Sequence, residues 1–419
     1  MSAAEASRPP RIAIFGLLGS GNLGNHGSFD AMLQFLRRDH PEAQITCICS
    51  GPEELERQYG IPSTGITWYQ AHGPGRSRAT TILRKMFGKV ADLVRMPLLF
   101  RNFDIVIIPG MGVLETTLEL NAWGFPYAML LMCVSARMAG AKVAFVSVGA
   151  NVARERTIKW LFVRATRLAT YRSFRDDYSR DSMRTMGLDV SRDKVYPDLA
   201  FALPAPEPRA EPHPSDERTI ALGVMDYHGA SADRAQAEEI SAEYTAKIVE
   251  FAGHLIDDGY RIRLVTGDPS DEVVVTAVID DLRKTRPGPA AKRLVREPAE
   301  SLGELMMQLD QADVVVASRY HNVQSALALA KPTISISYGI KSDVLMEKMH
   351  LAEFRQSIRT LDVPRLVDQL RALEARSGRI ETAMREQTAE YRSQLDQQFA
   401  VLSATLFGAG SSVDARGDQ

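Results

Sequence analysis

Short apolar runs rich in β-branched residues alternate with longer helical segments over most of the chain. A strand that is buried on both faces is apolar at nearly every position, so this alternation is typical of a parallel sheet covered by helices. The first series of runs comprises residues 11–15, 44–49, 104–109, 142–148 and 170–174. The second series comprises residues 219–225, 261–267, 292–295, 313–318 and 333–338. The sequence therefore predicts an α/β protein with two doubly wound, Rossmann-like domains.

A proline-rich stretch, residues 203–217, separates the two series. Proline fixes an extended backbone and supplies no N–H to a neighbouring strand, so this stretch is predicted to link the domains. We expect the N-terminal domain over residues 11–202 and the C-terminal domain over residues 218–363. The charged segment 364–408 has helical period and predicts C-terminal helices. The two ends, residues 1–10 and 409–419, are expected to be disordered.

Composition limits the partners of such a chain. Apolar residues make up 45% and charged residues 24%, which is ordinary for a globular protein. The formal net charge is -2, so no global field attracts nucleic acid. The three cysteines, Cys47, Cys49 and Cys133, lie in apolar runs without CxxC spacing. They are expected to be buried, reduced core residues.

The N-terminal residues lack the basic and apolar segments of a signal peptide, so a cytoplasmic location is expected. The most apolar region, residues 125–150, is interrupted by Arg137, Gly140 and Lys142. These interruptions predict a helix followed by a buried strand in place of a membrane span. Peripheral membrane association and oligomer formation are left open by the sequence.

A glycine-rich turn follows the first predicted strand. Gly19, Gly21 and Gly24 fit G-x-G-x-x-G ahead of a helix, where glycines let backbone N–H groups approach a ligand phosphate. A dinucleotide is not favoured, because the glycines do not follow the strand directly and the second strand does not end in an acidic residue. Asn22 either caps its own backbone or contacts a ligand. His26 is expected at the surface near the start of the helix.

Two more strand ends in the first half carry candidate residues. Gly110 and Gly112 follow the third predicted strand and form either a tight turn or part of a binding edge. Arg175 follows the fifth strand, where it either pairs with a neighbouring acid or binds an anion. Asp176 is expected to cap the next helix.

The strongest candidates lie in the second half. A buried strand ends in Ser318-Arg319-Tyr320-His321 just before a helix, and the next strand ends at Tyr338 and leads to Lys341. An arginine fork binds phosphate or carboxylate, a histidine transfers protons near neutral pH, and a helix N-terminus adds positive potential. In the alternative interpretation, the three residues have structural roles only: Arg319 is an ion-pair partner, His321 caps a helix and Lys341 is solvated. Clustering at one sheet edge favours an anion site.

Other types of site are not indicated. The sequence contains no HxxxH motif or His/Cys cluster, so no metal is predicted. It also contains no G-x-S-x-G turn and no Walker loop with its lysine. A hydrolase with a serine nucleophile and a P-loop enzyme are therefore not favoured.

Together these motifs resemble the polysaccharide pyruvyl transferase family. The family carries a glycine-rich start, a middle R-D-x-x-S element with a P-D turn, and a late S-R-x-H segment followed by a lysine. Here they read Gly19 to Gly27, Arg175-Asp176 with Ser179, Pro197-Asp198, and Ser318 to His321 with Lys341. The ordered set spans the chain from about Arg11 to Leu351. Asn25-His26 replaces the acidic pair common in the family. This difference affects the expected type of acceptor more than the expected donor.

The resemblance implies a fold like the B-type glycosyltransferases, with two Rossmann-like domains facing a cleft. It implies phosphoenolpyruvate as the donor substrate, with no cofactor, and a glycan or lipid-linked oligosaccharide as the acceptor. The product is a pyruvate ketal on a cell-surface polysaccharide, such as an exopolysaccharide of the cell envelope. The N-terminal domain is the expected acceptor side and the C-terminal domain the expected donor side.

In this scheme Arg319, Arg175 and Lys341 hold the two anionic groups of phosphoenolpyruvate, and His321 transfers a proton. Further substrate contacts are expected from the set Ser318, Tyr338, Gly21, Asn22, Gly24, Gly110 and Gly112. Two alternatives stay open at this point. One is a glycosyltransferase of the same fold with a nucleotide-sugar donor, and the other is a glycan-binding protein without catalysis.

Overall fold

The computed structural model describes residues 8–73, 77–116, 121–206, 218–229 and 231–408. The predicted leader (1–10) and linker (203–217) lie mostly outside the described residues, and the predicted tail (409–419) lies wholly outside them. Contacts divide the chain into two units. Unit 1 consists of Met1–Ser20, Ser28–Leu199 and Gln394–Gln419, and unit 2 of Gly21–Gly27 and Ala200–Ser393.

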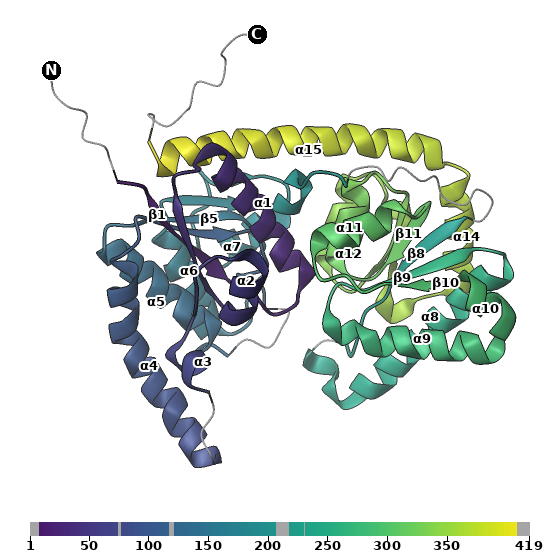
Figure 1. Ribbon diagram of the computed structural model, residues 1–419, viewed down its shortest axis with the longest axis horizontal. Coiled ribbons are helices and arrows are strands. Elements are labelled where there is room, and N and C mark those ends of the chain that lie inside the picture. Colours follow the sequence, from purple (N-terminus) through teal and green to yellow (C-terminus); the bar gives the residue numbers. More distant parts are fainter. Residues whose placement is uncertain (1–7, 74–76, 117–120, 207–217, 230, 409–419) are drawn as a thin grey trace, which may run out of the picture. The chain divides into compact units, whose positions relative to one another are not determined.

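Unit 1 is built on a seven-stranded sheet in the order β3-β2-β1-β4-β5-β6-β7 (Figure 1). Every neighbouring pair of strands is parallel. The strands are β1 (Arg11–Gly16), β2 (Gln44–Cys49), β3 (Ser63–Gly65), β4 (Ile105–Pro109), β5 (Lys142–Val148), β6 (Tyr171–Phe174) and β7 (Lys194–Val195). The helices are α1 (Leu23–Asp39), α2 (Pro52–Tyr59), α3 (Trp68–His72), α4 (Arg78–Phe100), α5 (Phe125–Met138), α6 (Arg156–Arg167) and α7 (Asp177–Thr185).

Unit 2 is built on a six-stranded parallel sheet in the order β10-β9-β8-β11-β12-β13. The strands are β8 (Thr219–Gly223), β9 (Arg261–Val265), β10 (Leu294–Arg296), β11 (Val314–Ala317), β12 (Thr333–Ser337) and β13 (Arg355–Ser357). The helices are α8 (Ala237–Asp257), α9 (Glu272–Thr285), α10 (Pro287–Arg293), α11 (Leu302–Asp310), α12 (Tyr320–Ala328), α13 (Ile340–Lys348) and α14 (Val363–Glu374). The last helix, α15 (Ser377–Leu406), belongs to unit 2 up to residue 393 and to unit 1 from residue 394.

Numbered along the chain, the first six strands of unit 1 and the six strands of unit 2 have the same order, which is that of a Rossmann fold; β7 extends the unit 1 sheet at one edge. The order reverses between β1 and β4 in unit 1 and between β8 and β11 in unit 2. In open α/β sheets, ligands bind outside the carboxyl ends of the strands at this reversal point. The candidate residues at these strand ends are therefore placed where such folds bind ligands.

The central strands are buried because their apolar side chains meet helices on both faces of each sheet. Every residue of β4, β8, β11 and β12 is buried. All ten predicted strands are confirmed. Three strands were not predicted, β3, β7 and β13, because each has only two or three residues and a largely polar sequence. Such short edge strands carry too few side chains for a periodic signal.

Several smaller predictions are confirmed. Residues 125–150 form helix α5 and strand β5. Cys47, Cys49 and Cys133 are buried and free. Among the described helices, none combines the length and the apolar character needed to cross a membrane. The fold is therefore α/β with two Rossmann-like domains, as the strand pattern predicts.

Candidate active site

Arg319 lies between β11 and α12, at the reversal point of the unit 2 sheet. Its Nη2 and Nε donate to the carboxylate of Asp271 at 2.5 and 3.0 Å. Burial lowers the pKa of Arg319, but the hydrogen bond to Asp271 and the charges of Asp271 and Asp268 oppose this, and the net shift is upward. The side chain therefore stays cationic. Among the described residues, none bonds to Nη1, which leaves that edge of the guanidinium for a ligand.

Asp271 fixes the orientation of this arginine. Its side chain has no exposed surface, and its carboxylate also accepts hydrogen bonds from the backbone N–H groups of Asp226 (2.9 Å) and Gly267 (3.3 Å). Asp226 follows β8, and Gly267 follows β9. A buried carboxylate that is held by two strand ends and paired with an arginine is a rigid support. Sequence reasoning missed Asp271, although it follows a third strand end in G-D-P-S-D.

Ser318 anchors the same turn from the core. Its backbone N–H donates to the Gly223 carbonyl at 2.9 Å, and its hydroxyl lies 2.8 Å from the Tyr244 hydroxyl. The Ser318 side chain is completely buried. Burial raises the pKa of Tyr244, although its bond with Ser318 opposes this shift. Ser318 thus positions the turn, and its direct contact with substrate stays a prediction.

His321, Lys341 and two tyrosines lie together beside Arg319. The rings of Tyr320 and His321 meet edge to face, with centroids 4.9 Å apart. The Nζ of Lys341 lies 5.4 Å from the ring centroids of both Tyr320 and Tyr338. Lys341 is therefore held by cation–π contacts with two aromatic rings, whereas the alternative interpretation expected it to be solvated. The structure thus brings together four residues that the sequence predicts for one anion site: Arg319, His321, Tyr338 and Lys341.

The N-terminus of α12 is part of this group. No described side chain caps it at Arg319. Asn322, in the first turn, is completely buried, and both polar atoms of its side chain lack a hydrogen-bond partner among the described residues. Its amide lies between Gly223 and Gly267, where an added Cβ would come within 2.9 and 2.7 Å of it. An uncapped helix start beside an unsatisfied amide is suited to bind an anion.

The glycine segment Gly21–Gly27 groups with unit 2. A Cβ at Gly24 would lie 1.8 Å from Nδ1 of His321 and would clash with it. The histidine ring can occupy this position because residue 24 is glycine. Asn22 Oδ1 accepts a hydrogen bond from the Asn25 N–H at 3.2 Å, which confirms its local capping role. Contact of Gly21, Asn22 or Gly24 with substrate stays a prediction. The surface placement expected for His26 is wrong, because this side chain is buried.

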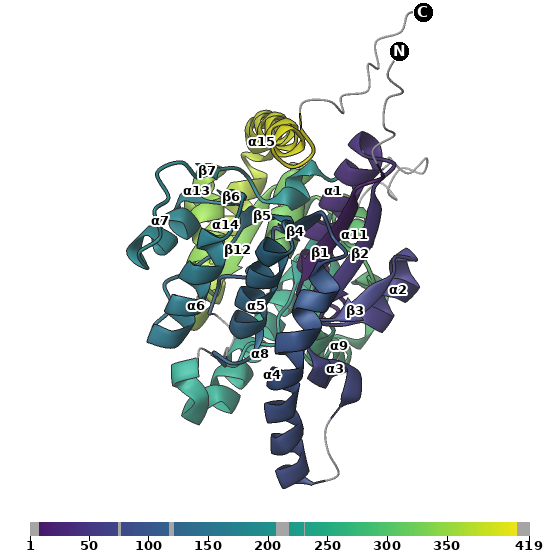
Figure 2. The ribbon, with the colours of Figure 1, turned by 90° about the vertical axis from the view of Figure 1, so that its left-hand side faces the viewer.

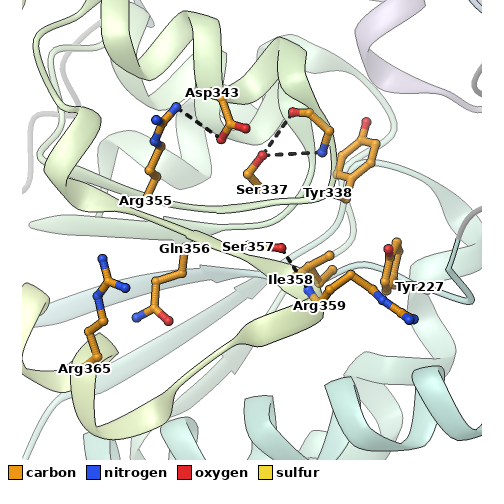
Figure 3. A pocket seen from close by; sticks show the side chains of 11 residues that line it. Tyr227, Ser337, Tyr338, Asp343, Arg355, Gln356, Ser357, Ile358, Arg359 and Arg365 are labelled. Carbon is orange, nitrogen blue, oxygen red and sulfur yellow. Dashed lines mark hydrogen bonds and ion pairs between the residues drawn. The ribbon is translucent and has the colours of Figure 1, made fainter.

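A pocket of about 400 Å³ lies at the carboxyl ends of β12 and β13 (Figure 3). Its lining includes the cations Arg355, Arg359 and Arg365, together with Tyr338. Arg355 lies 3.6 Å from Asp343, which also lines the pocket. The three arginines were missed by sequence reasoning because β13 was not recognised as a strand. Their positive charge suits an anionic ligand.

The candidate residues of unit 1 form a separate cluster. Arg175 is buried and lies within ion-pair distance of three carboxylates, those of Glu115, Asp176 (3.6 Å) and Asp198 (3.5 Å). The structure therefore confirms that Arg175 pairs with neighbouring acids. Its contact with an anionic substrate stays a prediction. Asp176 caps α7 by accepting from the Ser179 N–H at 2.6 Å, as predicted.

The second glycine turn supports this cluster. Gly110 and Met111 have positive φ angles of 51° and 59°, so the chain turns sharply after β4. A Cβ at Gly112 would lie 2.7 Å from the carboxyl carbon of Glu115. The tight-turn reading of Gly110 and Gly112 is confirmed, and the space above Gly112 is taken by Glu115. A substrate contact of these glycines stays a prediction. In the described part of the chain, no group of three His, Cys, Asp or Glu residues could hold a metal ion.

Solved structures with this fold are numerous. The chain is similar to the Staphylococcus aureus MnaA–UDP co-structure, with 10% identity, TM-score 0.61 and coverage of 97% of this chain and 100% of that one. It is similar to a Neisseria meningitidis UDP-GlcNAc 2-epimerase bound to UDP-GlcNAc, with 8% identity, TM-score 0.58 and coverage of 95% of this chain and 99% of that one. It is also similar to a Rickettsia africae glycosyltransferase, with 10% identity, TM-score 0.60 and coverage of 96% of this chain and 100% of that one. At these identities the likeness concerns the fold.

Sequence comparison gives a more specific result. No curated protein matches the chain significantly. The family model described as polysaccharide pyruvyl transferase matches residues 22–340, which is more than half of the chain. The match extends from the glycine segment through Arg175 and the Arg319 turn to β12. The chain belongs to the polysaccharide pyruvyl transferase family and is a transferase.

Proposed function

We propose that the protein transfers the pyruvyl group of phosphoenolpyruvate to two hydroxyls of a glycan, which forms a ketal and releases phosphate. The observation that carries this proposal is the group of Arg319, His321 and Lys341 at the uncapped start of α12. Phosphoenolpyruvate carries a carboxylate and a phosphate. Two fixed cations and a helix N-terminus offer complementary charge for both groups.

The residues then have separate roles. The Nη1 edge of Arg319, Lys341 and the first N–H groups of α12 bind the donor anions and stabilise the leaving phosphate. His321 is the general acid or base. In the balanced reaction, two acceptor oxygens bond to the central carbon and the C–O bond to phosphate breaks. One hydroxyl proton ends on the methylene carbon, which becomes a methyl group, and the other ends on phosphate.

The test compares binding and turnover in two variants. Phosphoenolpyruvate should raise the melting temperature of the wild type by about 2–5 °C. Arg319→Gln should lose this stabilisation. His321→Asn should keep it but release phosphate about a hundredfold more slowly when a lipid-linked oligosaccharide pool is supplied. Arg385→Gln, an exposed change on α15, is the matched control and should behave like the wild type.

A second candidate function is transfer of a sugar from a nucleotide sugar. The pocket lined by Arg355, Arg359 and Arg365 favours it, because arginines suit a diphosphate and structural neighbours were solved with UDP or UDP-GlcNAc. Stabilisation by UDP-GlcNAc that Arg359→Gln abolishes, with none by phosphoenolpyruvate, would favour this function. Binding of phosphoenolpyruvate without phosphate release from any acceptor pool would instead indicate a glycan-binding protein without catalysis.

A further inference from the structure

Large apolar side chains gather on one exposed face of α4 in unit 1. Eight of them are between 51% and 65% exposed: Ile82, Leu83, Met86, Phe87, Val90, Leu93, Val94 and Leu98. At 100° per residue, the eight positions fall within an arc of about 160° around the helix. A contiguous exposed apolar surface of this kind marks a site of interaction.

The opposite side of α4 holds the helix to unit 1. Gly88 and Asp92 are buried there. A Cβ at Gly88 would lie 3.3 Å from the ring of Trp68 in α3, and Asp92 Oδ1 accepts from the Trp68 N–H at 2.8 Å. The N-terminal half of α4 extends past the other elements of unit 1 in both views (Figures 1 and 2). Nearer its C-terminal end the helix is also anchored by the fully buried Met96 and Phe100. The apolar face opposite Gly88 and Asp92 is exposed.

Positive charge borders this apolar face. The helix contains five basic residues and one acidic residue, Asp92, which is buried and lies 3.3 Å from Arg95. On the same 100° projection, the cations fall on both flanks of the apolar arc: Arg84 and Arg95 on one side, and Arg78, Lys85 and Lys89 on the other. Arg84 and Arg95 donate to backbone carbonyls of residues 72–73 and 65–66. The other three cations can bury their stems while their charges reach lipid phosphates.

We propose that α4 binds a membrane surface rich in anionic lipid, with its apolar face inserted among the headgroups and its cations on the phosphates. The pattern of an apolar arc flanked by basic residues is that of an interfacial helix. A second copy of the chain is a poorer occupant, because a twofold contact through this face would bring like-charged rows together. This proposal does not depend on the proposed function, because membrane binding by α4 does not involve the donor site.

The test measures sedimentation of the full chain with vesicles. Vesicles of equal parts phosphatidylcholine and phosphatidylglycerol should bind the protein at least about tenfold more tightly than phosphatidylcholine alone, and added salt should weaken the binding. Leu83→Gln/Met86→Gln/Val94→Gln should bind at least about tenfold more weakly, because glutamine keeps the helix but removes the apolar surface. The charge variant Arg78→Gln/Lys85→Gln should bind anionic vesicles about tenfold more weakly.

The matched control is Val134→Gln/Met138→Gln/Val273→Gln, which changes exposed apolar residues outside α4 and should bind like the wild type. A polarity-sensitive dye on Val90→Cys should shift to shorter wavelength with anionic vesicles, and a dye on Met138→Cys should not; the native cysteines are buried. Equal binding of wild type and the α4 variants, or a vesicle-independent dimer that the apolar variant dissociates, would overturn the proposal.

Discussion

At the scale of single residues, the proposed donor site depends on a buried carboxylate that holds a cation. Asp271 accepts from Nε and Nη2, which form one edge of the Arg319 guanidinium, and is itself held by two backbone N–H groups. Arg319 therefore does not have to reorient when an anion binds, so the site is preorganised for its ligand. We therefore regard Asp271 as a positioning residue for Arg319.

We predict that Asp271→Asn weakens phosphoenolpyruvate binding about tenfold and lowers the free energy of unfolding by about 1–3 kcal/mol. The amide removes the charge that orients Arg319 and leaves the arginine partly unpaired. Calorimetric titration and urea denaturation measure the two effects. Asp280→Asn, an exposed change on α9, should alter neither. A loss of stability with unchanged phosphoenolpyruvate affinity would show that Asp271 has only a structural role.

Sequence pattern identified the residues that follow strands directly, because a polar residue after an apolar run is conspicuous. Arg319, His321 and Lys341 were found in this way, and the structure places them together. Asp271 and Asn322 were missed. Each is polar yet completely buried, and only tertiary contacts with other strand ends determine that environment. Local sequence carries no signal for such contacts.

At the scale of elements, the C-terminal part of α15 packs on the unit 1 sheet. Gln398 is completely buried and bonds to Ser147 at 3.0 Å and Ser173 at 2.8 Å. Lys142 donates to the carbonyls of Thr405 and Leu406 in the last turn of the helix, where a cation complements the helix dipole. The C-terminal part of the last helix is therefore an integral part of unit 1, far in sequence from the strands that it covers.

His40 makes this contact sensitive to pH. Its Nε2 lies 2.9 Å from the Ser403 hydroxyl, and its ring stacks on Phe407 with centroids 3.6 Å apart. Burial lowers the pKa of His40, although Glu42 and Asp39 oppose this shift. Because the folded pKa is below the unfolded one, the contribution to stability is present above about pH 6.5 and is lost as the pH falls below it.

We expect amide exchange in residues 394–406 to accelerate when the pH is lowered from about 7.5 to about 5.5, after correction for the intrinsic exchange rate. His40→Asn should exchange faster at the higher pH but show a weaker dependence on pH. His254→Gln, an exposed change on α8, should retain the wild-type profile. An unchanged pH dependence in His40→Asn would show that another group controls the contact.

Strands and helices with strong periodic patterns were predictable, and their boundaries agree closely with the structure. The helices predicted over residues 364–408 are also observed. The place where α15 packs was not predictable, because its charged sequence does not specify which surface it covers. Its tertiary contacts identify that surface, among them the buried Gln398 and the stacking of Phe399 on Phe35 at 4.5 Å.

At the scale of the whole molecule, the order of a Rossmann fold occurs twice, and each sheet carries polar residues after the carboxyl ends of its strands. In unit 2 these residues are cations around a helix start. In unit 1 they are Arg175 and three carboxylates, so the formal charge of the cluster is negative. The two units thus have different chemistry on the same scaffold. This contrast supports our proposal that unit 2 binds the anionic donor, with unit 1 as the expected acceptor side.

We predict that phosphoenolpyruvate slows amide exchange in the unit 2 segments 318–324 and 338–343, because it binds there. Segments 110–116 and 174–179 of unit 1 should respond to the acceptor instead. Exchange measured by mass spectrometry with each ligand separately distinguishes the two units. Protection by phosphoenolpyruvate in 174–179 alone would assign donor binding to Arg175 and contradict this division.

The most direct test of the donor site is a crystal structure of the protein with phosphoenolpyruvate. We predict that one anionic group of the ligand lies within hydrogen-bond distance of Arg319 Nη1 and the first turn of α12, with His321 beside the methylene carbon. The Arg319–Asp271 pair should be unchanged. Ligand density in the pocket of Arg355, Arg359 and Arg365 alone, or none in crystals grown at saturating phosphoenolpyruvate, would contradict the proposed function.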